Sequence, residues 1–230
     1  MIVPPSRLLA YTAAIGIEAS STELVSRKLK GKHLEIKLSE NNLISIGGNG
    51  LCYSDNNIIK AVKTGFALPQ FLPFLKNFKN GCESVYTLLA IKKIFSGKKS
   101  TTEKVAIALR AGITSTATFA NFDSQSKELL SDYKNVIIKF IVKDSDISFF
   151  LNKFEDKKWN VTSQCPNWNL DPSAVMVFSS LLIAERTLVN GFDHLGEIGR
   201  GSVMVSGNLP VLDKIGYISR KITKKLPLFL

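Results

Sequence analysis

The sequence predicts an α/β fold with a mostly parallel, Rossmann-like sheet and helices on both faces of that sheet. Three observations predict it. Apolar stretches with helical and with strand-like periods alternate along the chain. The continuous apolar run VIIKFIV, residues 136–142, is typical of a strand that is covered on both faces. Asp171-Pro172 is a helix start signal, and the residues after it are apolar nearly all round, which predicts a buried helix.

The composition favours one domain. The chain has 230 residues, 45% of them hydrophobic, and no linker interrupts it, so we expect a single α/β domain over residues 1–230. No apolar run reaches the roughly 18 residues that a membrane-spanning helix needs. Cys52, Cys82 and Cys165 lack zinc spacing and only two histidines are present, so we expect no metal site. Unpaired cysteines indicate a reducing compartment, the cytoplasm.

The N-terminal third is expected to alternate short helices and short strands. The segment 20–30 starts with Ser20 and Ser21, either of which suits a helix cap, and Gly31 can end a helix there. Ser54 can accept hydrogen bonds at the start of a further helix, and Gly65 can end it. The elements expected in this part are helices over 20–30 and 55–64 and strands over 33–38 and 43–46.

The segment 66–80 combines seven large apolar residues with two prolines. Pro69 and Pro73 interrupt any long helix, so we expect a packed loop or a short broken helix. Its aromatic residues then belong to the core, and the alternative is a lid or a groove for a partner. The elements expected next are helices over 83–95 and 123–132 and strands over 105–109 and 136–142.

The C-terminal part is expected to continue the alternation. Asp144 or Ser145 can cap a helix whose apolar residues follow the spacing i, i+3, i+4, i+7 up to Phe154. Residues 208–230 are expected to contain a basic amphipathic helix, with isoleucines on one side and lysines on the other. The remaining elements expected are a strand over 159–162, a helix from 171 to about 190 and a strand over 203–205.

The charge distribution indicates anionic partners. The net charge is +11, and residues 60–104 hold nine lysines against two glutamates. Such a surface attracts phosphates, nucleic acid or an anionic membrane surface, and Lys92, Lys93, Lys98 and Lys99 form its clearest cluster. The alternative is a basic protein whose charge serves solubility alone.

Two glycine-rich stretches are the candidate binding sites. In LISIGGNGLCYSDNN, the residues Gly47, Gly48, Asn49 and Gly50 lie between a predicted strand and the helix that begins near Ser54. Backbone amide groups at such a place can bind a phosphate, and the alternative is a tight turn.

The second stretch is DHLGEIGRGS, residues 193–202. Its glycines frame Arg200, whose guanidinium group suits a carboxylate or a phosphate, and the alternative is a plain surface connection. Cys165 and His194 are the one candidate nucleophile and base pair, but nothing in their spacing brings them together, which favours a structural or incidental cysteine.

Two parts of the sequence resemble the ubiquitin-activator-like adenylating fold. SAVMVFSSLLIAERTLVNG (173–191) followed by GSVMVSG (201–207) is similar to a late helix and strand of that family, and LISIGGNG is similar to its first strand and glycine loop. The family's paired CxxC zinc ligands and its adenylation-site arginine have no counterpart here. The resemblance therefore implies a degenerate, non-catalytic member that binds a protein partner.

These patterns lead to three hypotheses for the function. The first is binding of a nucleotide or other phosphorylated ligand at the glycine-rich loops, with group transfer as the accompanying reaction class and a nucleotide as the candidate cofactor. The second is the degenerate adenylating-enzyme-like scaffold, with a protein partner or a second copy of the chain. The third is a basic protein that binds nucleic acid or an anionic membrane surface.

Overall fold

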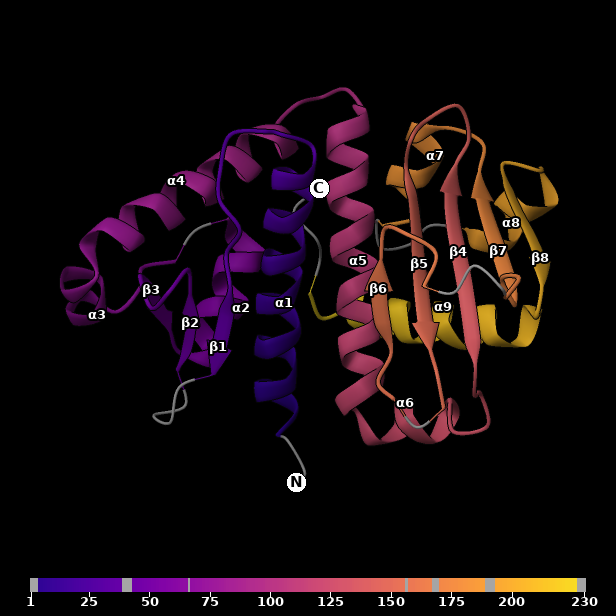
Figure 1. Cartoon of the computed structure of the whole chain (residues 1–230), viewed down its shortest axis with the longest axis horizontal. Coiled ribbons are helices and arrows are strands. Elements are labelled where there is room, and N and C mark those ends of the chain that lie inside the picture. Colours follow the sequence, from indigo (N-terminus) through magenta and orange to yellow (C-terminus); the bar gives the residue numbers. More distant parts are fainter. Residues whose placement is uncertain are drawn as a thin grey trace.

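A computed structural model describes residues 4–38, 43–65, 67–155, 157–166, 170–188 and 193–226. Its fold is α+β. A three-stranded and a five-stranded sheet lie on opposite sides of two long helices, α1 (Pro5–Ser26) and α5 (Thr102–Phe122), which run side by side through the middle of the molecule (Figure 1).

The first half of the chain builds one end of the molecule. Its three strands form an antiparallel sheet in sequence order; two of its three further helices contact the central pair, and the third, a short helix, packs on the sheet and on a neighbouring helix. These elements are β1 (Ile36–Leu38), β2 (Ile44–Ile46), β3 (Leu51–Tyr53), α2 (Asp55–Thr64), α3 (Phe71–Lys76) and α4 (Phe78–Phe95).

The second half builds the five-stranded sheet, whose strand order is β6-β5-β4-β7-β8. Of its four strand pairs, β4–β7 is parallel and the others are antiparallel. The strands are β4 (Val136–Val142), β5 (Ser148–Lys153), β6 (Asn160–Thr162), β7 (Ala174–Phe178) and β8 (Val203–Gly207). The helices are α6 (Ser124–Leu129), α7 (Leu181–Arg186), α8 (His194–Gly199) and α9 (Leu209–Thr223).

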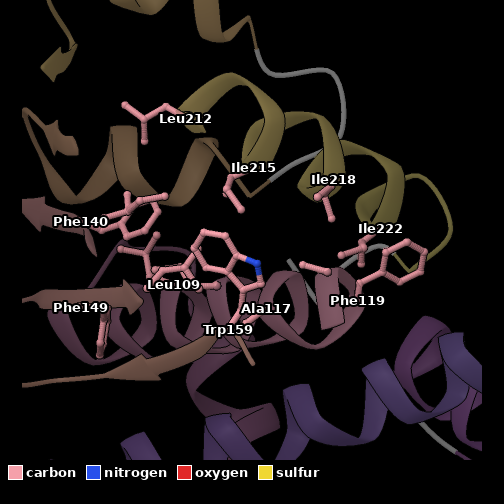
Figure 2. Close-up of a cluster of buried hydrophobic side chains, with 14 of the residues drawn as sticks. Leu109, Ala117, Phe119, Phe140, Phe149, Trp159, Leu212, Ile215, Ile218 and Ile222 are labelled. Carbon is pink, nitrogen blue, oxygen red and sulfur yellow. The ribbon is translucent and has the colours of Figure 1, made fainter. Parts of the chain in front are cut away.

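The main core lies between this sheet, α5 and α9. Alternate residues of β4 and β5, such as Phe140 and Phe149, point toward isoleucines of α9 and the side of α5 (Figure 2). Burying large apolar side chains of this kind contributes roughly 1.5–3 kcal/mol each. The amphipathic pattern of α9 is explained by this contact, because Ile215, Ile218 and Ile222 are all buried.

Small residues let α1 and α5 pack closely. A Cβ at Gly16 would lie 2.9 Å from Oγ of Ser115, so a larger residue there would push the helices apart. Near the end of α1, the buried Glu23 accepts hydrogen bonds from Nε of Arg27 and from Nη1 of Arg110, both at 2.8 Å. Arg110 belongs to α5, so this carboxylate joins the two central helices.

The predicted fold class is wrong. A mostly parallel sheet with helices on both faces requires parallel neighbours, whereas a single parallel pair occurs among the strand pairs of the described residues. The resemblance to the adenylating fold fails for the same reason. The stretch from Ala174 to Phe178 is strand β7 and not part of a helix, and the loop in LISIGGNG joins the antiparallel strands β2 and β3.

Three predicted elements have the opposite structure. Residues 105–109 belong to helix α5, because the alanines and hydroxyl residues that follow them are also buried and extend the helix. The helix expected from 144–154 is strand β5, in which Phe149 and Leu151 face the core and Phe150 faces the other side. The long helix expected from 171 is β7 followed by the short helix α7. Short apolar runs fit both the helical and the strand period, so tertiary contacts decide which of the two structures forms.

Other boundaries agree well with the sequence. Helix α2 begins at Asp55 and ends at Thr64, with the predicted Gly65 in a left-handed conformation after it. Strand β4 spans the predicted residues 136–142. The N-terminal helix is much longer than predicted, because it begins at Pro5, and Ser20 donates to the carbonyl oxygen of Gly16 within that helix.

We expect Glu23→Ala to destabilise the protein by about 3 kcal/mol or more, because it leaves Arg27 and Arg110 largely buried without their shared carboxylate. Urea unfolding followed by tryptophan fluorescence measures this, since Trp159 is buried in the main core. Glu128→Ala, at an exposed position of α6, is the control and should change stability by less than about 0.5 kcal/mol. Equal small effects of both substitutions would contradict the role of Glu23.

Candidate functional site

A large apolar cavity lies between the N-terminal helices and the central pair. Its volume is about 730 Å³, and it is lined by α1, α2, α4, α5 and the end of α9, with the segment 67–74 beside it. Such a volume lies within the range of about 300–1,000 Å³ that is usual for small-molecule sites. Apart from Ile17, the lining residues of the central helices are small: Ala13, Gly16, Ser20, Ala108, Ala111, Gly112, Ser115 and Thr116.

The opposite wall is made of larger apolar side chains. Helix α2 contributes Ile58 and Val62 together with the smaller Ala61, and α4 contributes Leu88 and Ile91. The helical spacing of these residues turns one apolar face of each helix inward, as expected for amphipathic helices. Space remains because the facing positions on α1 and α5 carry small side chains, which cannot fill the volume between the helices.

The polar groups of the cavity are few and mostly occupied. The hydroxyl groups of Ser20 and Thr116 donate to carbonyl oxygens of their own helices at 2.9 Å, and Ser115 donates to the carbonyl oxygen of Thr12 at 3.4 Å. Among the described lining residues there is no Asp, Glu, His or Cys. What this lining offers a bound molecule is apolar contact and a small number of hydroxyl groups.

Tyr53 differs from these hydroxyl residues. It lines the cavity from strand β3 and is 5% exposed. Burial raises the pKa of Tyr53 to about 12, and no hydrogen bond or charge within the described part of the chain contributes to that pKa. The phenol therefore stays neutral near pH 7 and keeps a proton that it can donate. Its oxygen is not one of the fully buried atoms without a partner, so the hydroxyl stays accessible and can donate to an acceptor that a ligand brings.

The opening of the cavity combines exposed apolar side chains with lysines. The exposed side chains of Leu68, Phe71 and Leu89 belong to the cavity lining and also reach solvent. Lys63 and Lys92 are exposed lining residues as well. We call these five residues the mouth of the cavity.

The glycine stretch 47–50 is the turn between β2 and β3. Gly47, Gly48 and Asn49 have φ values of 65°, 61° and 64°, a left-handed conformation that glycine and asparagine adopt most readily. A Cβ at Gly47 would lie 1.9 Å from Oγ of Ser84, and a Cβ at Gly50 would lie 2.5 Å from backbone atoms of α4. The turn therefore packs directly on α4, and this contact explains its glycines without a ligand.

The other predicted site residues lie apart from the turn or have other partners. Ser54 precedes α2, and its carbonyl oxygen accepts from the amide of Ile58 at 3.0 Å, without a side-chain cap. Arg200 follows α8, and its Nη2 donates to Oε1 of Glu197 at 2.6 Å. This hydrogen bond lowers the pKa of Glu197 and raises that of Arg200.

The two glycine-rich stretches do not form one site. The β2–β3 turn and α8 lie in opposite halves of the molecule, on either side of the central helices (Figure 1). A nucleotide site at the ends of parallel strands is therefore wrong as a function for this fold. A role for Gly47, Gly48, Asn49, Gly50, Ser54 or Arg200 in binding another ligand stays a prediction.

The structure bears on only some of the other expectations from the sequence, which concern metal binding, cysteines, location and partners. In the described ranges, no three His, Cys, Asp or Glu residues lie close enough together to hold a metal ion. Within the described residues no disulfide joins Cys52, Cys82 and Cys165, and burial raises the pKa of Cys52. No helix among the described residues is both long and apolar enough to cross a membrane. A cytoplasmic location, and the partners expected from the sequence, stay predictions.

Comparisons with known proteins find similarity in structure but not in sequence. No family model and no curated protein sequence matches the chain. A solved structure described as "UbiJ-SCP2 Ubiquinone synthesis protein" is similar with a TM-score of 0.37 and 16% sequence identity, over 47% of this chain and 85% of that chain.

The sequence analysis missed the cavity. One wall of the cavity is α5, and the pattern of residues 105–109 predicts a strand there. The small residues that follow are therefore not predicted to form a helix face. The segment 66–80 did carry a signal, since a lid or groove was the alternative to core packing. Phe71 and Phe74 line the cavity, and most other large apolar residues of the segment that the structure describes are exposed rather than in the core.

We expect Gly50→Ala to destabilise the protein by about 1–3 kcal/mol, because the new methyl group would overlap backbone atoms of Asn80 and Gly81. Thermal unfolding checks this. Gly199→Ala is the matched control, since a Cβ there meets no atom within 4 Å, and it should leave stability unchanged or raise it by up to about 1 kcal/mol. Two variants of equal stability would show that the turn does not pack on α4 in this way.

Proposed function

We propose that the protein binds an apolar, chain-like small molecule in the cavity between α1, α2, α4 and α5. The observation that carries this proposal is the cavity itself, with a volume of about 730 Å³ and a lining that is almost entirely apolar. Apolar cavities do not gain ordered water readily, and they bind apolar molecules instead. The expected functions based on phosphate binding, on a degenerate adenylating enzyme or on basic residues alone are replaced by this one.

The energetics suit a long hydrocarbon chain. Each buried methylene group contributes about 0.8 kcal/mol, so about 15 of them would contribute ~12 kcal/mol. Loss of translational and rotational freedom costs ~4 kcal/mol or more, which leaves a dissociation constant of about 1 μM. A ligand of this kind therefore needs no charged contact inside the cavity in order to bind with useful affinity.

Tyr53 supports a ligand with a hydrogen-bond acceptor. Its neutral hydroxyl group lacks a partner among the described residues, whereas the serine and threonine hydroxyl groups of the lining already donate to backbone carbonyls. A carbonyl, ester or ether oxygen on the ligand would satisfy this donor. The ligand class proposed is therefore an apolar chain that carries a neutral oxygen acceptor.

We expect the wild-type protein to bind a fluorescent polyene fatty acid at a single saturable site, and Ala61→Phe to weaken that binding about tenfold or more. Ala61 lines the cavity from α2, and a phenyl ring there would occupy space that at least two ligand methylenes need. Fluorescence titration measures the affinity, because the polyene emits more strongly once it leaves water.

Asn57→Phe is the matched control for this experiment. Asn57 lies on the same helix, is exposed and is not part of the lining, so the variant adds the same ring outside the cavity. Its affinity should equal that of the wild type, and thermal unfolding should show both variants folded. Saturable binding that Ala61→Phe leaves unchanged, or no binding by the wild type, would overturn the proposed function.

We expect Tyr53→Phe to weaken binding of a long-chain methyl ester by about 2- to 10-fold, since a net hydrogen bond contributes about 0.5–1.5 kcal/mol. The measurement is displacement of the polyene probe by the ester and by an alkane of the same chain length. Because the alkane has no acceptor, its affinity should not change. An equal loss for ester and alkane would show that Tyr53 shapes the cavity but does not donate to the ligand.

A further inference from the structure

A row of large apolar side chains beside the cavity is exposed to solvent. Leu72 is 69% exposed and Leu75 is 51% exposed, and three neighbours are exposed by more than half as well. We call the five the apolar ridge: Leu68, Phe71, Leu72, Leu75 and Phe78. Clusters of this kind are rare on the surfaces of monomeric soluble proteins and mark interaction sites.

The local sequence holds the ridge on the outside. Pro69 and Pro73 limit α3 to the six residues Phe71–Lys76, so the segment cannot extend into a longer packed helix. Phe74 turns inward and lines the cavity, and its ring lies against Gly81, where a Cβ would come within 2.7 Å. One inward aromatic residue thus anchors α3, and its other large side chains face solvent at the end of the molecule opposite the five-stranded sheet (Figure 1).

Basic residues surround the ridge. Lys63, Lys76 and Lys79 are exposed, and the sequence contains no Asp or Glu between Asp55 and Glu83. A surface with exposed Phe and Leu side chains and lysines at its edges fits the interface of a bilayer, where the apolar groups enter the acyl region and the lysines meet anionic headgroups. Each lysine near such a surface adds favourable electrostatic attraction.

We propose that the apolar ridge docks on a lipid bilayer that contains anionic headgroups. A second copy of the chain fits less well, because a two-fold contact would place Lys76 and Lys79 of both copies against each other. The surface differs from the lysine clusters indicated by the sequence, since apolar side chains carry the contact and the lysines strengthen it.

The ridge is continuous with the mouth of the cavity. Leu68 and Phe71 belong to both, so a docked protein would hold its cavity open toward the acyl region of the membrane. This consequence rests on the proposed function: an apolar ligand would then pass between bilayer and cavity without crossing water. The docking itself depends on the ridge alone.

The test is co-sedimentation with vesicles of phosphatidylcholine, with and without phosphatidylglycerol. The wild type should bind the mixed vesicles, and the double variant Leu72→Ser/Leu75→Ser should lose binding about tenfold or more, since two apolar side chains no longer enter the bilayer. Lys76→Gln/Lys79→Gln should lose about 10- to 30-fold on mixed vesicles and little on pure phosphatidylcholine.

The control removes two equally exposed leucines elsewhere. Leu182, 51% exposed, lies on α7, and Leu195, 83% exposed, lies on α8, so Leu182→Ser/Leu195→Ser should bind vesicles as the wild type does. Leu72 and Leu75 are not part of the cavity lining, so the ridge variant should still bind the polyene fatty acid. Ala61→Phe should still bind vesicles, which separates failure of this proposal from failure of the proposed function.

Results of two kinds would overturn the proposal. One is absence of vesicle binding by the wild type, or equal losses in the ridge variant and the α7–α8 control. The other is a dimer in analytical ultracentrifugation that the ridge substitutions convert to a monomer, with no effect on vesicles, which would assign the ridge to a second copy of the chain.

Discussion

The packing of α1 against α5 is the contact on which the rest of the structure depends. Helix α5 faces α1 on one side and the five-stranded sheet with α9 on the other, so it is a wall of both halves. Gly16 allows the close approach, and the buried Glu23 binds arginines on both helices. An ion pair of this kind resists separation, because either partner alone would leave an uncompensated buried charge.

The cavity is a consequence of the same small residues. Alanine, glycine and serine side chains bring the central helices together, but they leave a volume that the apolar faces of α2 and α4 do not fill. Helix α4 cannot collapse into this volume easily, because the glycine turn between β2 and β3 is packed on its first residues. The glycines of the candidate phosphate site therefore help to hold α4 in place from outside the cavity.

The two proposals describe one physical arrangement. An apolar ligand needs a path that avoids water, and the mouth of the cavity lies on the surface where apolar side chains and lysines are exposed. In the proposed binding mode, the phenol of Tyr53, which is neutral near pH 7, would favour a ligand that carries an acceptor. Leu68 and Phe71 belong to both surfaces, but Leu72 and Leu75 lie outside the cavity lining and Ala61 lies within it, so binding and docking can be removed separately.

The sequence by itself determined the elements whose signals are local. Helix α2 ends at its predicted glycine, α9 has its amphipathic pattern, and residues 136–142 are a strand as predicted. Only the tertiary structure decided the strand pairing, the helical state of 105–109 and the cavity. Pairing depends on contacts between distant segments, short apolar runs suit both periods, and a cavity exists between elements rather than within any one of them.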